Sequence, residues 1–157
     1  LNGERAPFYS PDARAGFFGI SPHTTRAQLQ RAVFEGLAFA IVDALQGYPQ
    51  GGELYLTGGG AASATWLQII ADCTGRTVVS SAFNELSARG AAILAARSVA
   101  ALAETPPLAQ TRYQPRPQAH ARYAALYPVY RLLREQMLPV WQARQAALQR
   151  LSQEVQP

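Results

Sequence analysis

Residues 54–66, LYLTGGGAASATW, decide how this chain is organised. Three consecutive glycines, Gly58, Gly59 and Gly60, separate an apolar run typical of a strand from a run typical of a helix. Ordering a glycine costs more conformational entropy than ordering any other residue, so three in a row indicate a main chain that turns sharply or is closely approached. The stretch predicts a strand, a glycine turn and a helix in immediate succession.

A second strand is expected beyond that helix. The first strand is predicted over residues 53–57, the helix over 65–74 with Gly75 ending it, and the second strand, rich in β-branched residues, over 76–80. Thr65 and Gln68 have the spacing of a capping box at the helix start. A helical crossover of about twenty residues joins parallel strands, so we expect a right-handed βαβ unit. Two strands make a poor sheet, and further strands are therefore expected from upstream segments or from a partner chain.

Helices and loops are expected on both sides of this unit. They are an ordered loop over 1–23 whose aromatic residues pack onto the protein, a helix over 24–47, a helix over 86–102, a proline-rich connector over 103–118, and a helix over 119–153 that Pro128 and Pro139 kink or divide. The second half of the 24–47 helix, GLAFAIVDAL, is apolar nearly all round and predicts burial on more than one side. The chain is thus expected to adopt an α/β fold with parallel strands and flanking helices.

Composition excludes several classes of protein. The chain has 157 residues, 48% of them hydrophobic, and a net charge of +4 carried by scattered arginines, so one globular domain without a nucleic-acid-binding stripe is expected. The single cysteine, Cys73, excludes an internal disulfide and predicts a small buried hydrophobe. Arg97 interrupts the longest apolar run, so neither a membrane partner nor a membrane span is expected, and the location predicted is cytoplasmic. Because the chain begins with Leu1 rather than Met, we expect a piece of a longer protein.

The glycine turn has the features of a ligand site. A helix that begins just after a strand offers free N–H groups and a partial positive charge to an anion. Glycines at 58–60 would let a phosphate or a purine ring lie against the main chain, Ala61 and Ala62 continue the small surface, and Ser63 adds a hydroxyl. Neither the dinucleotide fingerprint nor a P-loop fits, because Ser63 replaces the third glycine and no G-K-[ST] follows. Spacing alone leaves a ligand site and a turn that packs helix on strand equally open.

Other charged or imidazole side chains are expected to be structural. Glu35 lies four residues after Arg31 on a helix, where an ion pair is favoured over a catalytic role. Asp43 and Asp72 are expected to be solvated or to cap, and His120 carries no functional signal. No group of His, Cys and carboxylate residues has metal-ligand spacing, so no metal site is predicted in this chain.

Five segments, in order along the chain, resemble the C-terminal part of the FGGY carbohydrate kinases, and within that family the xylulokinases most. They are GERAPFYSPDARAGFFGIS at 3–21, RAVFEGLAFAI at 31–41, LTGGGAASATWLQIIADCTGRTVV at 56–79, ELSARGAAILAA at 85–96 and RYQPRPQAHARYAALYPVYRLL at 112–133. Because these segments cover nearly the whole chain in register, the resemblance is specific.

The resemblance implies a fold and an activity. The fold would be part of a ribonuclease-H-like, actin-type ATPase domain, with residues 1–157 as the C-terminal, nucleotide-side domain that lacks its first strands and the N-terminal domain. The full-length enzyme would use ATP and Mg²⁺ to phosphorylate a sugar hydroxyl, with D-xylulose or a related ketopentose as substrate. A kinase for another sugar or polyol, such as glycerol, erythritol or ribulose, and a non-catalytic assembly fragment stay open as alternatives.

Site residues follow from the same resemblance. The family's GGGA segment lines the adenosine pocket, and this implies a nucleotide-binding role for Gly58, Gly59, Gly60, Ala61 and Ser63. In related glycerol-type kinases an Asn often follows the glycines, and Ala64 stands in its place, so an adenine contact is not carried over to that side chain.

The catalytic base is expected outside this chain. In the family it is an Asp of a Gly-Asp segment in the N-terminal part, and none of Asp12, Asp43 and Asp72 matches that segment. No catalytic residue is therefore assigned, and the chain alone is not expected to be a working kinase. Its expected partners are the sugar substrate and the remainder of the kinase chain, and exposed sheet edges leave a homodimer open.

Overall fold

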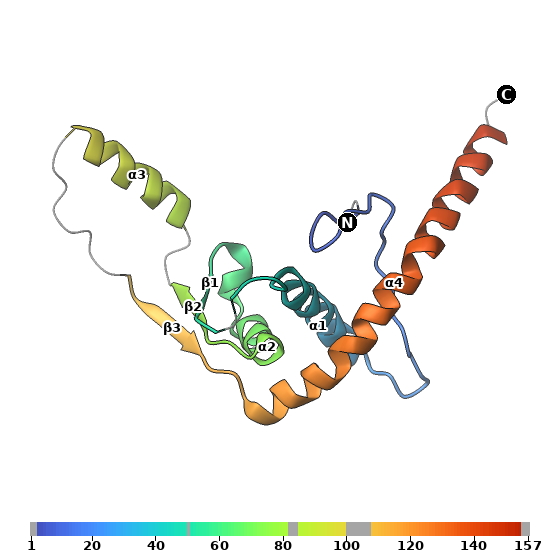
Figure 1. The fold of residues 1–157 in the computed structure, drawn as a ribbon, viewed down its shortest axis with the longest axis horizontal. Coiled ribbons are helices and arrows are strands. Elements are labelled where there is room, and N and C mark those ends of the chain that lie inside the picture. The colour runs from blue at the N-terminus through green and yellow to red at the C-terminus, as the bar shows by residue number, and fades with distance from the viewer. Residues whose placement is uncertain (1–2, 50, 82–84, 100–107, 155–157) are drawn as a thin grey trace. The chain divides into compact units, whose positions relative to one another are not determined.

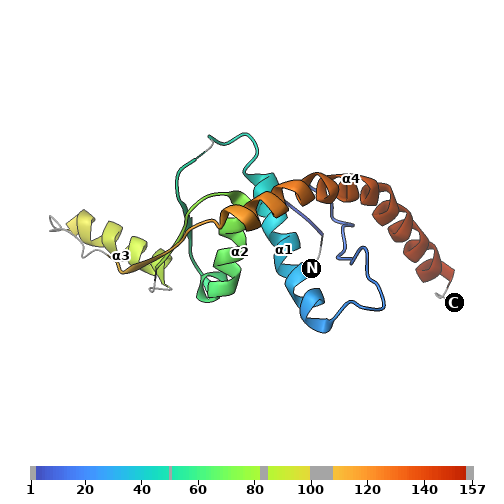
Figure 2. The same cartoon turned by 90° about the horizontal axis from the view of Figure 1, so that it is seen from below.

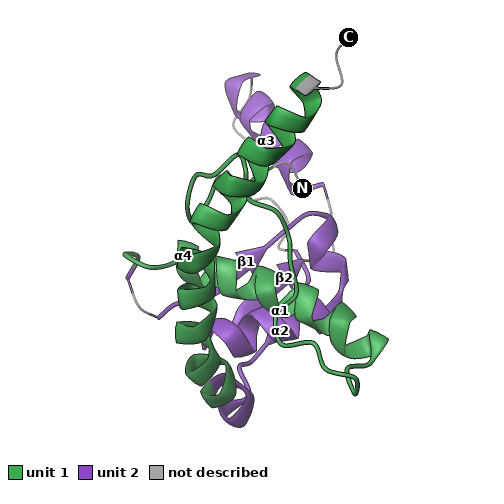
Figure 3. Cartoon of the chain, turned by 90° about the vertical axis from the view of Figure 1, so that its right-hand side faces the viewer, with its two compact units in different colours: residues 1–48, 121–157 green, residues 49–120 purple. Residues whose placement is uncertain are grey.

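The computed structural model describes residues 3–49, 51–81, 85–99 and 108–154. The elements are, in order, α1 (Arg26–Ala44), β1 (Leu54–Leu56), the short 3₁₀ helix η1 (Gly59–Ala62), α2 (Ala64–Thr74), β2 (Val78–Ser81), α3 (Leu86–Val99), β3 (Gln110–Tyr113) and α4 (Pro117–Glu154) (Figure 1). They form two compact units, residues 1–48 with 121–157, and residues 49–120 (Figure 3).

The unit of residues 49–120 contains a three-stranded sheet in the order β1-β2-β3. β1 pairs parallel with β2, with Leu54 opposite Val78, so the predicted βαβ unit is confirmed. Apolar side chains of α2 and β2 form its core; they are Leu67, Ile69, Ile70, Ala71, Cys73, Val78 and Val79. Cys73 is therefore a buried small hydrophobe, as its position in an apolar run predicts.

The sheet has a third strand that the sequence does not predict. Residues 110–113 fall inside the expected proline-rich connector, yet they pair antiparallel with β2, with Tyr113 opposite Val78. This short segment contains no proline and carries Thr111 and Tyr113, residue types that favour strands, so it can complete a ladder between the flanking prolines. The strand was not predicted because the neighbouring prolines made residues 110–113 look like part of a connector.

The two ends of α2 are set by different signals. Ser63, and not Thr65, is the N-cap, and its hydroxyl accepts a hydrogen bond from the Trp66 N–H at 3.3 Å, so the predicted capping box is wrong. At the other end Gly75 has φ +67°, the left-handed conformation in which helices commonly end, as predicted.

The unit of residues 1–48 and 121–157 is built on α1 and α4. A capping box of Thr25 and Gln28 begins α1. The ring of Phe39 packs against three tyrosines of α4, with centroid distances of 5.9, 6.0 and 5.3 Å; they are Tyr123, Tyr127 and Tyr130. This aromatic cluster is the core of the unit.

α4 begins earlier than predicted and is not divided. Pro117 occupies its first position, where a proline is favoured because the missing N–H is not needed. The helix continues through Pro128 and Pro139, and Figure 2 shows that it bends along its length, so the prolines bend the helix and do not end it.

Burial of the predicted apolar segments is less complete than expected. In α1 only Ala38 and Phe39 are buried, while Leu37 stays 49% exposed, because the described part of this unit supplies a loop and a helix but no sheet to cover the second face. In the N-terminal loop Phe8 stacks on Trp141, as expected, but Tyr9, Phe17 and Phe18 are exposed; the expectation that all four pack is wrong. α3 has no buried residue, and the rest of the helix predicted over 86–102 lies outside the described residues.

Gly75 should be intolerant of any side chain. A methyl group there would lie 2.7 Å from Cε1 of His120, whose Nδ1 is 2.9 Å from the Asp72 carbonyl oxygen, so the ring cannot move without losing that contact. The left-handed conformation costs a residue with a side chain about 1–2 kcal/mol, and the steric clash adds to this cost. We therefore expect Gly75→Ala to lower the free energy of unfolding in urea by at least about 1–2 kcal/mol.

Gly90→Ala is the matched control. Nothing lies within 4 Å of a methyl group at this exposed helical position, so its free energy of unfolding should stay equal or rise slightly. In a second comparison, His120→Ala in the Gly75→Ala background should relieve the steric part of the loss. Equal stabilities of Gly75→Ala and Gly90→Ala would contradict the assignment.

Candidate functional site

The glycine turn lies at the carboxyl edge of the parallel strands. β1 ends at Leu56, Gly58 follows, and η1 begins at Gly59. The hydroxyl of Ser80, near the carboxyl end of β2, donates to the Ala61 carbonyl oxygen at 3.3 Å, which ties the turn to that strand. The carboxyl edge of parallel strands is where open α/β sheets bind ligands.

The conformation of the turn requires glycine at one position and leaves space at two. Gly58 has φ +83° and ψ −171°, which a residue with a Cβ rarely adopts. Apart from its chain neighbours, no described residue has a heavy atom within 4 Å of the place that a methyl group at Gly58 or Gly59 would occupy. At Gly60, by contrast, it would lie 3.3 Å from Nε1 of Trp66. Added side chains would thus have space at Gly58 and Gly59, whereas at Gly60, which is itself exposed, they would meet the indole of Trp66.

Ala61 and Ser63 are held by the turn itself. The Ala61 N–H donates to the Gly58 carbonyl oxygen at 2.9 Å, and its carbonyl oxygen accepts from Ser80. The Ser63 oxygen accepts from the Trp66 N–H as the cap of α2, and this contact does not use the Ser63 O–H donor. The structure therefore brings all five residues singled out from the sequence into one turn.

The turn offers groups that could bind a ligand but no side chain that could transfer a proton. Residues 58–63 have no titratable side chain, so they offer main-chain groups, one hydroxyl and a small surface. Such a surface suits a flat ring or a phosphate that must approach the backbone closely. Among the described residues no group of three or more His, Cys, Asp or Glu side chains could hold a metal ion. Within the same residues no helix is long and apolar enough to cross a membrane.

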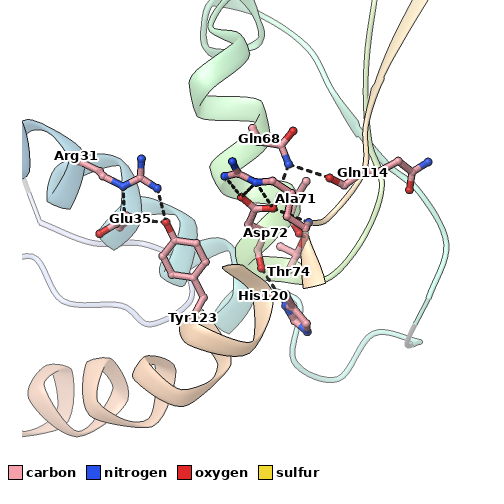
Figure 4. Close-up of polar contacts among 10 residues, drawn as sticks. Arg31, Glu35, Gln68, Ala71, Asp72, Thr74, Gln114, His120 and Tyr123 are labelled. Carbon is pink, nitrogen blue, oxygen red and sulfur yellow. Dashed lines mark hydrogen bonds and ion pairs between the residues drawn. The ribbon is translucent and has the colours of Figure 1, made fainter. Parts of the chain in front are cut away.

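Glu35 belongs to a structural cluster. Nε of Arg31 donates to its carboxylate at 2.7 Å, the Tyr123 hydroxyl donates to the same oxygen at 2.7 Å, and Nη2 of Arg31 donates to that hydroxyl at 2.8 Å (Figure 4). Burial and the bond to Glu35 raise the pKa of Tyr123 to about 12. The pairing of Glu35 with Arg31 that its spacing predicts is confirmed.

Asp72 is neither solvated nor a cap, which corrects the expectation from the sequence. Its carboxylate is completely buried in α2 and is bound by Nη2 of Arg116 at 2.5 Å, the Arg116 N–H at 2.8 Å and Nε2 of Gln68 at 3.0 Å (Figure 4). Burial alone raises the pKa of Asp72, but the hydrogen bonds from Arg116 and Gln68 outweigh it and hold this pKa below its ordinary value. The network joins α2 to the segment between β3 and α4.

Asp43 needs the same correction. One of its carboxylate oxygens accepts from the Tyr127 hydroxyl at 2.6 Å, and the other forms an ion pair with Arg134. An aspartate within an otherwise apolar helical run is the signal that could have predicted both buried carboxylates, because a buried charge needs a partner. No comparable sequence pattern predicts the contacts made by His120, Ser80 and Trp66.

Comparison with known proteins places the chain in a family. The family model described as FGGY family of carbohydrate kinases, C-terminal domain, matches residues 1–99. The chain belongs to the FGGY family of carbohydrate kinases. The xylulose kinase of Escherichia coli (strain K12) is 33% identical over 151 residues, which cover 89% of this chain and 31% of that protein. The erythritol kinase of Brucella abortus (strain 2308) is 35% identical over 149 residues, which cover 88% and 28%.

A solved FGGY kinase has the same fold. The crystal structure of ligand-bound xylulose kinase from Lactobacillus acidophilus matches with a TM-score of 0.78 and 25% identity, over 87% of this chain and 30% of that one. The predicted α/β class is confirmed, with a small mixed sheet and flanking helices. This FGGY chain spans less than a third of the length of these three relatives.

Replacing Arg116 should destabilise the fold, because the buried Asp72 carboxylate would lose its ion-pair partner. Arg116→Met leaves that charged acceptor without its ion-pair partner, and we expect the free energy of unfolding in urea to fall by about 1–3 kcal/mol. Arg112→Met is the matched control, because Arg112 pairs at 3.0 Å with Glu53 at the surface and should matter much less. Equal losses in the two variants would contradict the assignment.

The same carboxylate predicts how stability depends on acid. An unfolded Asp titrates near pH ~3.9, and the folded pKa of Asp72 lies lower, so its contribution is complete above that pH and is lost as pH falls through the folded pKa. Asp72→Asn should therefore show a shallower decline of unfolding free energy below about pH 4 than the unmodified protein.

Proposed function

We propose that this chain is the nucleotide-side part of an ATP-dependent carbohydrate kinase, and that the glycine turn binds the adenosine part of ATP. Gly58, Gly59 and Gly60 would lie against the nucleotide, with Ala61 and Ser63 beside them. The observation that carries the proposal is the open main chain at Gly58 and Gly59, at the carboxyl edge of β1 and β2, in a member of a kinase family.

The proposed roles within the chain are binding and orientation. ATP supplies the phosphoryl group, and Mg²⁺ bound with it neutralises phosphate charge. In such transfers catalysis is mostly positioning and charge stabilisation, so a turn without titratable groups can serve it. The described residues offer no cluster of metal ligands, so Mg²⁺ would be held by the phosphates and by residues outside this set. The base that accepts the sugar proton would lie in the remainder of the kinase chain.

The proposed substrate is D-xylulose or a related ketopentose. Several similar proteins are xylulose kinases, including those of Escherichia coli and Staphylococcus epidermidis. A polyol or another sugar is the alternative, and it is favoured by the similarity to an erythritol kinase and to a glycerol kinase. The enzyme would act in the cytoplasm, and residues 1–157 would not phosphorylate the sugar unaided.

Filling the open side of the turn should remove nucleotide binding. Gly59 has no positive φ, and an added methyl group would have no neighbour within 4 Å in the part of the chain that the structure describes, so Gly59→Val should change the free energy of unfolding by no more than about 1 kcal/mol. In isothermal titration with ADP we expect the protein to bind and Gly59→Val to bind at least about tenfold more weakly, or not at all. Gly60→Val is a poorer probe because it would also displace Trp66.

Gly16→Val is the matched control. It introduces the same side chain at an exposed glycine without positive φ and without a neighbour within 4 Å, so ADP affinity should not change. A folded protein that binds no ADP would favour a non-catalytic assembly role. ADP binding that survives Gly59→Val would refute the site but not the kinase assignment.

The substrate is tested separately on the full-length gene product. We expect ATP-dependent phosphorylation to be fastest, by kcat/KM, with D-xylulose in a panel that includes ribulose, erythritol and glycerol. A higher kcat/KM for a polyol would replace the ketopentose by the alternative and leave the nucleotide site unaffected.

A further inference from the structure

Two side chains from different elements hold the back of the glycine turn. Ser80 of β2 is only 6% exposed, and its hydroxyl donates to the Ala61 carbonyl oxygen at 3.3 Å. Trp66 of α2 presents the pyrrole edge of its indole to Gly60, where an added methyl group would lie 3.3 Å from Nε1 and 3.6 Å from Cδ1. The turn thus contacts both β2, through Ala61, and α2, through Gly60.

The contact with Ser80 fixes a whole peptide plane. The peptide bond is planar and trans, so a carbonyl oxygen that points to Ser80 directs the N–H of Ala62 the opposite way. The other main-chain group of Ala61, its N–H, is already bound to the Gly58 carbonyl oxygen at 2.9 Å. Ala61 is therefore tied at both ends, and the path of the preceding glycines is fixed with it.

The contact with Trp66 limits where a side chain could be added to the turn. A methyl group at Gly60 would meet the indole at 3.3 Å, although Gly60 itself is exposed, whereas, apart from the chain neighbours, no described residue places a heavy atom within 4 Å of a methyl group at Gly58 or Gly59. The turn therefore leaves space for a ligand beside the main chain of Gly58 and Gly59. The main-chain N–H of Trp66 donates to the Ser63 hydroxyl, which caps the start of α2.

We propose that Ser80 and Trp66 are positioning residues for the nucleotide: Ser80 holds Ala61 and Trp66 lies against Gly60, so that the main chain of Gly58 and Gly59 is presented to the ligand. The inference rests on the proposed function, since it names how the same turn is prepared for ATP. Neither side chain touches the nucleotide; each acts through the main chain of residues 60 and 61. A flexible glycine turn would lose conformational entropy when it binds a ligand. Because these two contacts already order the turn, less entropy is lost on binding.

Ser80→Ala tests the hydrogen bond. We expect the Kd for ADP, measured by isothermal titration, to rise about fivefold to tenfold, because the lost bond no longer preorganises the turn. In the kinase assay on the full-length gene product, KM for ATP should rise while kcat changes little. Thr77→Val is the matched control: it removes a hydroxyl that donates to Gln114 at 2.9 Å at the other end of the same strand, and Kd should not change.

Trp66 offers a direct readout of the turn. The chain contains two tryptophans, so in a Trp141→Phe background the indole fluorescence reports Trp66 alone. ADP should change its emission, and Trp66→Phe, which lacks the pyrrole edge, should raise the Kd for ADP without abolishing folding.

The outcomes separate the inference from the proposed function. If the unmodified protein binds no ADP, both fail. If it binds ADP and Ser80→Ala binds equally well while only its unfolding midpoint drops, the contact is merely structural and the inference alone is overturned. If Thr77→Val weakens ADP binding as much as Ser80→Ala, the effect is general loss of stability and the inference is likewise overturned.

Discussion

The parallel pairing of β1 with β2 is the constraint on which the unit of residues 49–120 depends. It brings the carboxyl ends of both strands to one edge, so the chain that leaves β1 meets Ser80 at the end of β2. The pairing also requires α2 to carry the chain back across the sheet. The helix is held there by the Asp72 carboxylate, which is buried and bound to Arg116 just beyond β3. Crossover helix, third strand and glycine turn are thus parts of one packed arrangement.

The paired carboxylates of this chain lie outside its proposed ligand site. The side chains that look reactive, Glu35, Asp43 and Asp72, are each bound to an arginine and a second hydrogen-bond donor, as a buried or half-buried charge requires. The proposed site has no titratable group and offers the main chain itself. This division fits phosphoryl transfer, in which positioning and charge neutralisation do most of the work and one part of an enzyme can bind the nucleotide while another supplies the base.

Prediction from sequence succeeded where the signal was local. The periodicity of α1, the β-branched run of β2 and the helix-ending Gly75 each depend on neighbouring residues, and all three are confirmed. Prediction failed where nearby residues favoured another structure. The prolines around β3 favoured a connector, and the spacing of Thr65 favoured it over Ser63 as the cap of α2. The turn itself was located by its glycines, but the positions at which a side chain would fit could not be predicted, because Trp66 comes to lie beside Gly60 only once α2 has formed.

The sequence by itself determined the order of the helices and of the first two strands, the place of the glycine turn and the membership of a kinase family, since these depend on residue types and their spacing. Only the tertiary structure decided that Asp72 is paired with Arg116, that Ser80 holds Ala61 and that the ring of His120 fills the space beside Gly75. Those contacts join residues 19 to 45 positions apart. Their partners become neighbours only when the strands pair and the helices pack, so no local pattern announces them.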